Sequence, residues 1–520
     1  MSNLTRKEGF LLTLRGGFLI TSVLSFIITS AVIFLEIVGA NHGVLTYTLD
    51  DPYIHLALAE NIRDFHYGVN LGEYSAPSSS ILWPILISML SVAETAPLVF
   101  NILITMLSIY MVAIQLPEPE GKSLSGFLLG GVFSFLFVYS TNAVGLVYTG
   151  MEHSLQVLCV IATCYGMQEI GKTNKVPLWF VVVVVVVSPL VRYENMAISA
   201  SAIMYLALIG QFRASAITSI VMISLLAGFS MYLNYLGLGY FPSSILAKSS
   251  IVEGSGGRME SLMSNFTSNI SHSSGYFLFF SLILGVASLV FRRNRRAISL
   301  VIVLFLGVLM HLLLGRHGWF NRYEIYSLVF SICILFLIYK DELTRPWKYK
   351  MVVSGVVVVF IFFGRNYLFD LVEVPQASNN IYSQQFQMHR FVTEYYKNPV
   401  AVNDLGWVAY ENDNYVLDLW GLASFEALKS RLNEEHDWIE RITQEKDVRL
   451  VMVYKPWFPK LPKSWVKIGD LETSGKLVTP AYYKVSFYST NPDEVPYLKE
   501  LILRYSKTLP KNSKFNMMDL

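Results

Sequence analysis

The chain has 520 residues, of which 53% are hydrophobic and 15% are charged, and its mean hydropathy is +0.46. Forty Lys and Arg residues against 38 Asp and Glu residues give a net charge of +2, so no charge excess argues for a nucleic-acid partner. Together with repeated apolar runs of membrane-spanning length, this composition predicts a polytopic α-helical membrane protein.

Eleven apolar segments are each near the roughly 20 residues that a bilayer requires. Their approximate ranges are 16–39, 97–115, 124–141, 152–170, 176–191, 195–211, 214–233, 275–291, 297–315, 323–340 and 350–368. With a cytoplasmic N-terminus, fifteen Lys and Arg residues fall on the predicted inner segments and six on the short outer loops, which agrees with the retention of basic residues inside. The first segment is too long for a signal-peptide core and is read as an uncleaved span.

The spans at 176–191 and 195–211 are the least certain pair, because Pro189 could instead kink one continuous element. In that alternative, Arg192 and Glu194 would lie within the membrane and would need partners.

Two adjacent carboxylates, Asp50 and Asp51, follow the first span. Pro52 suits the first position of a helix, so Asp51 is the expected N-cap and Asp50 the carboxylate left free to face a substrate. An amphipathic helix lying in the membrane interface is predicted from the apolar residues Ile54, Leu58, Ile62 and Phe65, with Gly68 as its stop. The alternative is that both aspartates only cap and solvate a surface helix.

Further polar residues fall at the outer ends of later spans, and the long outer loop adds Lys248. They are Glu152, His153, Arg192, Glu194, Arg322 and Tyr323. Ionisable groups at the membrane edge are costly, so their recurrence on one side predicts a shared polar cavity there. Each alone could be an interfacial anchor, and for Arg316, His317 and Trp319 that reading is at least as good.

Residues 370–520 lose the apolar runs and are predicted to form an α/β soluble domain on the outer side. VAVNDLGWVAY, NYVLDLWGL and VRLVMVYK are predicted strands, and SFEALKSRLNEEHDWIERITQEK a helix with Ser424 as N-cap. Four aromatic residues could recognise a glycan or could belong to the core: Trp407, Tyr410, Trp420 and Trp457. The three cysteines, Cys159, Cys164 and Cys333, lie in apolar segments and are expected to be small hydrophobic residues.

DDPYIHLALAENI, followed by GVNLGEYSAPSSSILWP, resembles the first extracytoplasmic loop of type C (GT-C) glycosyltransferases. The resemblance is to bacterial polytopic members related to arabinofuranosyltransferases and mannosyltransferases, which use polyprenyl-phosphate sugars. Similar elements follow in the same order: TGMEHSL, VRYEN, FPSSILAKS, NRYEIY and NDLGWVAYENDNYVLDLWGLAS. Three positions depart from the family pattern, namely Ala57, Tyr193 and Ser243, so the identity of the sugar is not carried over.

The resemblance implies a transmembrane glycosyltransferase domain over 1–369, with a catalytic outer loop at 40–96, and an extracytoplasmic domain over 370–520. It implies inverting transfer of a sugar to an acceptor hydroxyl of a cell-envelope glycan, glycolipid or glycoprotein, in the bacterial cytoplasmic membrane. Asp50, beside Asp51, is the expected general base. Lys248, Arg322 and Arg192 are the expected ligands of the donor phosphate, in that order.

Four residues are expected to position the acceptor or support the site: Glu152, His153, Glu194 and Tyr323. No cofactor is required, although Glu152, His153 and Glu194 could join Asp51 around a divalent cation. The glycine- and serine-rich loop that follows Lys248 could close over bound donor, and its sequons at Asn265 and Asn269 carry little weight. A transporter or flippase of a lipid-linked or anionic solute is an alternative, as is a surface-polysaccharide ligase or polymerase. The sequence lacks the paired broken segments that many transporters show.

Overall fold

The computed structural model describes residues 13–90, 93–117, 123–170, 177–248, 258–341 and 347–518. These residues group into two compact units. The helical unit comprises Met1–Phe34, Leu98–Ala227 and Gly254–Val372. The sheet unit comprises Leu35–Pro97, Gly228–Glu253 and Glu373–Leu520, so the segment after the first span belongs with the C-terminal segment.

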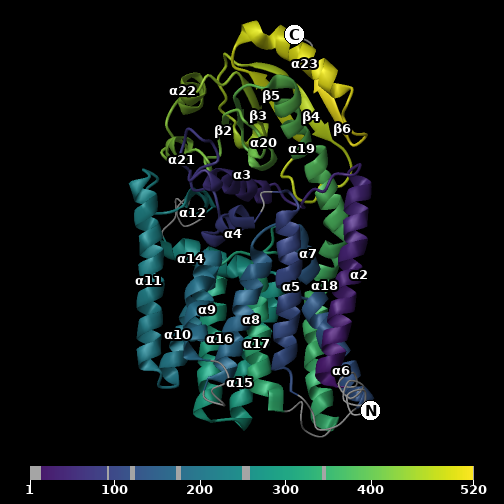
Figure 1. Cartoon of the computed structure of the whole chain (residues 1–520), viewed down its shortest axis with the longest axis vertical. Helices are drawn as coiled ribbons and strands as arrows, with labels where there is room; N and C mark the ends of the chain where they lie inside the picture. Colours follow the sequence, from purple (N-terminus) through teal and green to yellow (C-terminus); the bar gives the residue numbers. More distant parts are fainter. Residues whose placement is uncertain are drawn as a thin grey trace. The chain divides into compact units, whose positions relative to one another are not determined.

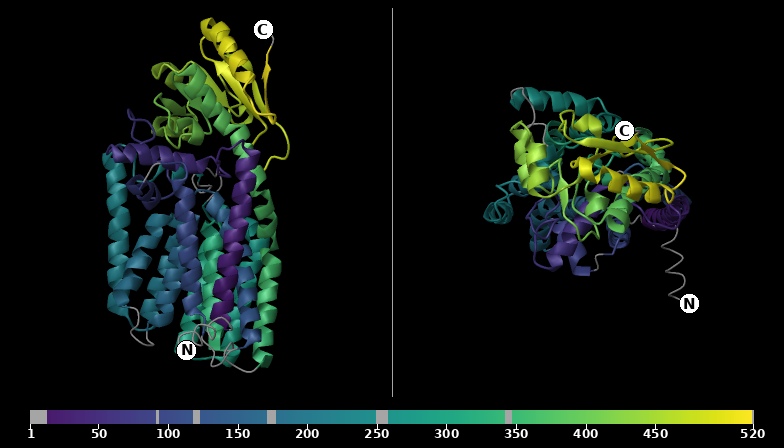
Figure 2. Two further views of the ribbon diagram at one scale, coloured as in Figure 1. Left: turned by 45° about the vertical axis from the view of Figure 1, so that its right-hand side comes forward. Right: turned by 90° about the horizontal axis from the view of Figure 1, so that it is seen from above.

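The helical unit is built mainly from apolar helices that run side by side, joined by the short helix α7 and the polar helix α14 (Figures 1 and 2). Their bounds are α2 Leu14–Ala40, α5 Ala96–Gln115, α6 Leu124–Tyr139, α7 Ala143–Tyr148, α8 His153–Glu169, α9 Leu178–Val191, α10 Met196–Leu208, α11 Phe212–Tyr235, α14 Arg258–Ile270, α15 Ser273–Phe291, α16 Arg295–Leu314, α17 Ile325–Tyr339 and α18 Trp347–Ser383. The last residues of α2, α11 and α18 belong to the sheet unit.

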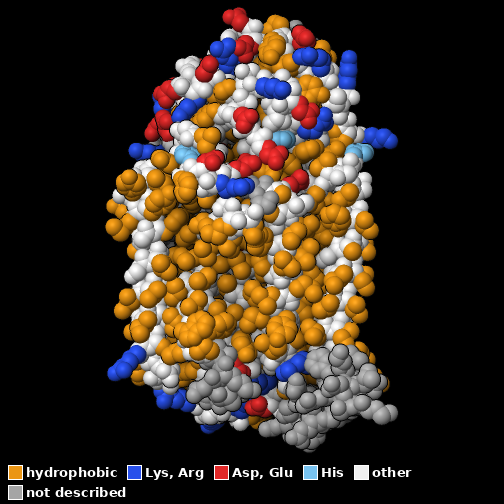
Figure 3. Space-filling view, in the orientation of Figure 1, with side chains coloured by type: hydrophobic (Ala, Val, Ile, Leu, Met, Phe, Trp, Pro, Cys, Tyr) orange, Lys and Arg blue, Asp and Glu red, His pale blue; other side chains and the backbone are white. Residues whose placement is uncertain are grey.

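Within the described residues, seven helices are long and apolar enough to cross a membrane, and α9 and α17 are shorter apolar helices. Each of the eleven predicted spans coincides with a helix, although α8 and α10 fall below spanning length at 17 and 13 residues. The face of the helical unit seen in Figure 3 is covered by hydrophobic side chains. The chain therefore has the architecture of a polytopic helical membrane protein.

The segment around Pro189 forms two helices. Helix α9 ends at Val191, Arg192 is extended, and a 3₁₀ turn over Tyr193–Asn195 leads into α10. Helices α9 and α10 pack against each other, so the reading as one kinked helix is wrong.

Helices α2 and α6 approach closely where both carry glycine. A Cβ atom added to Gly17 or Gly130 would collide with the backbone of the opposite helix. Small residues at such crossings let helices pack tightly in lipid, where no hydrophobic force drives association.

The sheet unit contains a six-stranded sheet in the order β2-β1-β3-β5-β4-β6 (Figure 1). Strand β1 Val400–Val402 is parallel to both neighbours, β2 Val416–Asp418 and β3 Leu450–Val453. The other strands pair antiparallel: β4 Val466–Thr473, β5 Lys484–Ser489 and β6 Ser513–Met517. The accompanying helices are α19 Gln385–Arg390, α20 Gly406–Ala409, α21 Phe425–Leu432, α22 Trp438–Glu445 and α23 Val495–Ser506. The predicted C-terminal sheet domain is thus confirmed.

The single helix predicted after Ser424 is wrong, because the chain breaks into α21 and α22. Glu434 and Asp437 between them have positive φ, which interrupts a right-handed helix. Ser424 stands at the N-cap position of α21 without capping it; its hydroxyl donates instead to Glu73.

The segment after α2 forms two helices in the sheet unit, α3 Asp51–Arg63 and α4 Leu82–Leu90. The first two turns of α3, Pro52–Ala59, are buried on every side. The prediction of an amphipathic helix with one wet face is therefore wrong for these turns. The end of α3 packs on the last turns of α11 through a cluster of apolar residues that includes Leu58, Ile62, Tyr67, Leu233 and Leu238.

Candidate functional site

The carboxylate of Asp50 is held by the backbone of the C-terminal segment. Its Oδ2 accepts a hydrogen bond from the Gly406 amide at 2.7 Å, and its Oδ1 accepts one from the Trp407 amide at 2.9 Å. Asp50, not Asp51, occupies the N-cap position of α3, and its side chain makes no cap hydrogen bond there. The predicted division of roles, with Asp51 capping and Asp50 free, is therefore wrong.

Three carboxylates meet at this point: Asp50, Asp51 and Asp404. Burial raises the pKa of Asp50 to about 8, and the charges of Asp404 and then Asp51 add to the shift. The two backbone amides act in the opposite direction, because they favour the ionised form. Burial also raises the pKa of Asp404, and the charge of Asp51 contributes again. Close negative charges disfavour one another, so this group holds protons more tightly than exposed aspartates do.

Asp404 was not predicted as a site residue. Its Oδ2 accepts from the side-chain amide of Gln385 at 2.9 Å, and its Oδ1 accepts from the side-chain amide of Asn403 at 3.1 Å. Asn403 in turn accepts from the Tyr454 backbone amide at 2.6 Å. Two amides therefore fix the orientation of the Asp404 carboxylate. Its only signal in the sequence is a position two residues after the end of a short apolar strand.

The fold explains why these groups converge. Strands β1 and β3 are parallel neighbours, but the chain leaves β1 toward β2 on one side and leaves β3 toward β4 on the other. The connections after β1 and β3 therefore run in opposite directions from the carboxyl ends of the two strands. Ligands of doubly wound sheets bind at such a switch point, with anions at the start of the helix after the strand. Asn403 and Asp404 follow β1, and Tyr454 follows β3. Asp50 thus takes the place that a bound anion takes in those sheets.

Further hydrogen bonds join the segment after α3 to the same sheet. The side-chain amide of Asn70 donates to the Val416 carbonyl at 3.0 Å and its oxygen accepts from the Val416 amide at 2.9 Å, as a neighbouring strand would. Glu73 accepts from the hydroxyls of Tyr415 at 2.5 Å and Ser424 at 3.1 Å. The segment after the first span and the C-terminal segment therefore form one folded body.

The FPSSILAKS element forms helix α12, Ser243–Lys248. The hydroxyl of Ser244 donates to the Ser78 carbonyl at 2.7 Å, and the Ser78 hydroxyl lies 3.1 Å from Nδ1 of His55 on α3. This places α12 against the segment that follows α3. The side chain of Lys248 and residues 249–257 lie outside the described residues.

In the helical unit, Arg192 is neutralised by two glutamates. Its Nη1 donates to Glu152 at 2.7 Å, and its Nε and Nη2 donate to the two carboxylate oxygens of Glu194 at 3.1 and 2.7 Å. Arg192 and Glu152 are buried, so these bonds compensate charges that water does not reach. They hold the guanidinium beside the ring of Tyr323, 5.7 Å from its centroid.

Arg322 is 1% exposed and lies against the same tyrosine. Its guanidinium carbon is 5.0 Å from the Tyr323 ring centroid, and its Nη2 donates to the Tyr323 hydroxyl at 3.3 Å. The His153 ring also lies beside the Tyr323 ring, with centroids 6.3 Å apart. The structure therefore gathers the predicted residues Glu152, His153, Arg192, Glu194, Arg322 and Tyr323 around one aromatic ring.

The backbone before Arg322 is strained. Gly318 and the three residues after it, Trp319, Phe320 and Asn321, all have positive φ. The Arg322 amide donates to the Gly318 carbonyl at 3.3 Å, which closes a left-handed helical turn. This conformation costs roughly 1–2 kcal/mol per residue other than glycine. Such strain persists where surrounding contacts enforce it, here the bond from Asn321 to Asp370 at 2.5 Å, and it is concentrated at functional sites.

The two sequon asparagines, Asn265 and Asn269, act as helix caps. Both side-chain amides donate to the Gly315 carbonyl at 2.9 Å, and each also donates to a carbonyl of the last turn of α16. These bonds satisfy carbonyls that α16 leaves without intrahelical partners.

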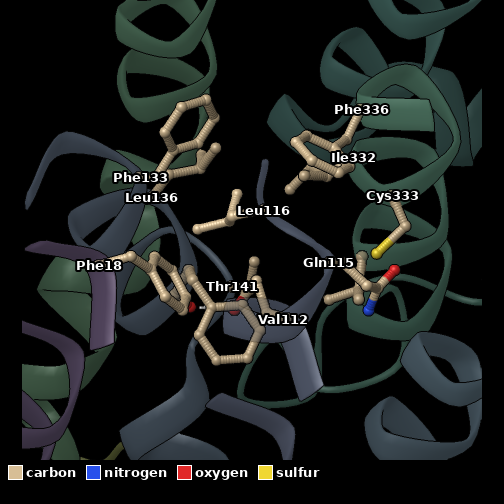
Figure 4. Close-up of a pocket in the computed structure, with 12 residues that line it drawn as sticks. Phe18, Val112, Gln115, Leu116, Phe133, Leu136, Thr141, Ile332, Cys333 and Phe336 are labelled. Carbon is tan, nitrogen blue, oxygen red and sulfur yellow. Dashed lines mark hydrogen bonds between the residues drawn. The ribbon is translucent and has the colours of Figure 1, made fainter. Parts of the chain in front are cut away.

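A cavity of about 60 Å³ lies between α2, α5, α6 and α17 (Figure 4). Its walls are mainly Phe18, Phe133, Phe336, Leu116 and Ile332, with Gln115, Thr141 and Cys333 as polar or sulfur-bearing exceptions. The described residues that line it include no charged side chain, so they offer no group for acid–base or phosphate chemistry.

A metal site would need several His, Cys, Asp or Glu side chains close together. Among the described residues, no group of three or more His, Cys, Asp or Glu side chains is arranged to hold a metal ion. The three members of the suggested set that lie in the helical unit, Glu152, His153 and Glu194, do not form such a group.

Comparisons with known proteins give a match to a family model and similarity to solved structures. A family described as "Domain of unknown function (DUF8728)" matches residues 379–488. No curated protein matches the chain. The archaeal oligosaccharyltransferase AglB from Archaeoglobus fulgidus, solved with an inhibitory peptide and a dolichol-phosphate, is similar over 96% of this chain and 76% of its own. The TM-score is 0.46 and the sequence identity 10%. The assignment of a function therefore rests on the residues of this chain.

Proposed function

We propose that the chain is a type C glycosyltransferase that moves a sugar from a polyprenyl-phosphate donor to an acceptor hydroxyl, with inversion at the anomeric carbon. The single observation that carries the proposal is the fixed carboxylate of Asp50, oriented by the Gly406 and Trp407 amides beside Asp51 and Asp404. The motif resemblance supports the same class, since Asp50 is the residue that matches the acid of the first outer loop.

Asp50 acts as general base. As the acceptor oxygen bonds to the anomeric carbon, its proton passes to a carboxylate oxygen of Asp50, and the bond from the anomeric carbon to the phosphate oxygen breaks with its electron pair. A base works best when its pKa is near the working pH, because it is then both ionised and a good proton acceptor. Burial and the neighbouring carboxylates place the pKa of Asp50 in that range.

The departing polyprenyl phosphate needs a cation. We assign Arg322 to bind this phosphate, because a guanidinium can hold two phosphate oxygens at once. Lys248 is assigned as a second phosphate ligand. Arg192 is a weaker phosphate ligand than the sequence suggests, since three of its nitrogens already donate to Glu152 and Glu194. We assign it, with these glutamates, His153 and Tyr323, to support of the site or to acceptor binding.

We assign the enzyme to the bacterial cytoplasmic membrane, with the N-terminus on the cytoplasmic side and residues 370–520 on the outer side. The acceptor is a hydroxyl of a cell-envelope glycan, glycolipid or glycoprotein. No step requires a cofactor. The C-terminal segment is assigned to the catalytic centre, because it supplies the amides that hold Asp50.

Transfer from labelled polyprenyl-phosphate sugars to envelope glycan acceptors, by the purified protein in lipid nanodiscs, tests the proposal. We expect turnover by the wild type with one donor class, and a loss of roughly 10²–10⁴-fold for Asp50→Asn. Asp447→Asn is the matched control, because the Asp447 carboxylate is exposed and pairs with its neighbour Arg449. Wild-type protein that turns over no donor but moves a lipid-linked solute across the bilayer would replace the proposal with transport.

A further inference from the structure

Both the backbone and the ring of Trp407 belong to the Asp50 site. The amide donates to Oδ1 of Asp50 at 2.9 Å. The ring stacks on Tyr53 of α3, with centroids 3.9 Å apart. Two residues of α19 also contact the ring, Phe386 at a centroid distance of 4.9 Å and His389 at 5.3 Å. Since Trp407 is only 3% exposed, these neighbouring rings fix the orientation of its side chain.

Two polar atoms in this group of rings have no hydrogen-bond partner among the residues that the structure describes. They are Nε1 of Trp407 and Nδ1 of His389, and both are hidden from solvent. An indole N–H can only donate a hydrogen bond, whereas a nitrogen of a neutral imidazole can donate or accept one. Unpaired buried polar groups are costly and rare, so each calls for a water molecule or a ligand that completes it.

A hydroxyl group is the ligand that fits this pair of atoms. Its oxygen accepts from the indole N–H, and its hydrogen is donated to the imidazole nitrogen. Two hydrogen bonds of about 2.9 Å each span up to about 6 Å. This span suits two rings whose centroids are 5.3 Å apart. Sugars carry hydroxyls on neighbouring carbons, so one hydroxyl can occupy this place while the next one faces the base.

We propose that Trp407 and His389 form a subsite for a second hydroxyl of the acceptor sugar, next to the hydroxyl that Asp50 deprotonates. This inference rests on the proposed function of Asp50. It narrows the acceptor to a sugar with neighbouring hydroxyls and excludes an isolated hydroxyl, such as that of a serine side chain. The sequence leaves Trp407 open as a core residue or a glycan ligand, and the subsite gives its ring the first role and its N–H the second.

Trp407→Phe is the variant that tests the subsite. It removes the indole N–H but keeps an aromatic ring against Tyr53 and the backbone amide that holds Asp50. Trp465→Phe is the matched control, because it makes the same exchange at a buried tryptophan in the core cluster around Ile442. Melting temperatures of both variants show whether the smaller ring is tolerated equally at the two positions.

The first readout is equilibrium binding to protein in nanodiscs without donor. The probes are methyl glycosides of hexoses and pentoses, their monodeoxy analogues, and N-acetylserinamide as an isolated hydroxyl. For the glycoside that the wild type binds best, we expect one monodeoxy analogue to bind about tenfold more weakly, the loss typical of one hydrogen bond. Trp407→Phe should bind parent and analogue equally, whereas Trp465→Phe should discriminate as the wild type does.

Three results would overturn the inference. They are discrimination by Trp407→Phe equal to that of the wild type, which would leave the two atoms to an ordered water only; binding of N-acetylserinamide as tight as that of the glycosides; and binding of no glycoside. His389→Phe gives a second test, because it keeps a ring against Trp407 and removes the nitrogen. It should reduce the same discrimination, and an unchanged value would contradict the assigned role.

Transfer assays separate this inference from the proposed function. With donor present, the loss in Trp407→Phe should appear mainly in the acceptor KM, because the indole N–H binds the acceptor before and during the reaction. If Asp50→Asn transfers at the wild-type rate while Trp407→Phe has lost the discrimination in binding, the proposed function fails and the subsite stands. A slow Asp50→Asn together with full discrimination by Trp407→Phe removes only the subsite.

Discussion

Substitution of Gly406, which is far from Asp50 in the sequence, tests the site around Asp50. The Gly406 amide donates to Asp50 across 356 residues of sequence. A Cβ atom added at Gly406 would lie 2.7 Å from both Cγ and Oδ2 of Asp50, and closer still to the Asp50 carbonyl oxygen, whereas real Cβ contacts stay above 3.0 Å. Gly406→Ala therefore cannot fit unless Asp50 moves.

The size of the effect follows from that overlap. Clearing the carbonyl oxygen requires a displacement of about 1 Å, and misplacement of a reacting group by this distance costs roughly 10²-fold in rate. Weakening the charge-assisted bond from Gly406 also costs roughly 1.5–3 kcal/mol of stability. We expect kcat to fall by about two orders of magnitude, with a smaller change in KM.

The assay is single-turnover transfer from a labelled polyprenyl-phosphate sugar by protein in nanodiscs, with the melting temperature measured in parallel. Gly72→Ala is the matched control, because it lies in the same unit and a Cβ there meets no atom within 4 Å. If Gly406→Ala folds and turns over at the wild-type rate, the amides of α20 do not position the base, and the site as described is wrong.

Three other outcomes follow from the structure. Below pH 8 the kcat/KM of the wild type should rise about tenfold per pH unit and then level off, because Asp50 must lose its proton to act and burial holds its pKa near 8; a flat profile over pH 6–9 would exclude Asp50 as the base. Phe65→Gly should stabilise the protein by about 1 kcal/mol, since Phe65 is 98% exposed at a φ of 59° that glycine adopts freely; a lower melting temperature would show that the ring is covered by lipid or a partner. Glu152→Ala should destabilise the protein by about 3 kcal/mol, because it removes one of the two carboxylates that compensate buried Arg192; a melting temperature equal to that of the wild type would contradict this.

The sequence predicts those features that depend on local pattern. Apolar runs place the helices, and the short runs in VAV, VLD and LVMV place β1, β2 and β3. Asp50, Asp51 and Pro52 mark the start of α3 to within one residue. The difference of one residue matters. Asp50 occupies the N-cap position with a helical backbone conformation, and its side chain binds outside α3 instead of capping the helix.

Hydrogen-bond partners that are far apart in the sequence could not be predicted from it. Nothing near Asp50 indicates that amides 356 residues away would bind it, because strand order in the sheet decides which loops meet. Arg192 shows the same limit: Glu194 is close in sequence, but Glu152 is 40 residues away. The left-handed turn before Arg322 was also hidden, since the two residues in its middle, Trp319 and Phe320, do not favour positive φ.

The most direct test of the proposed function is transfer by Asp50→Asn. Asparagine keeps the shape of the side chain but cannot take up the acceptor proton as a carboxylate does. With the melting temperature preserved, we predict that the variant transfers sugar roughly 10²–10⁴-fold more slowly than the wild type in the nanodisc assay, while donor binding remains. Transfer by folded Asp50→Asn at the wild-type rate would contradict the account.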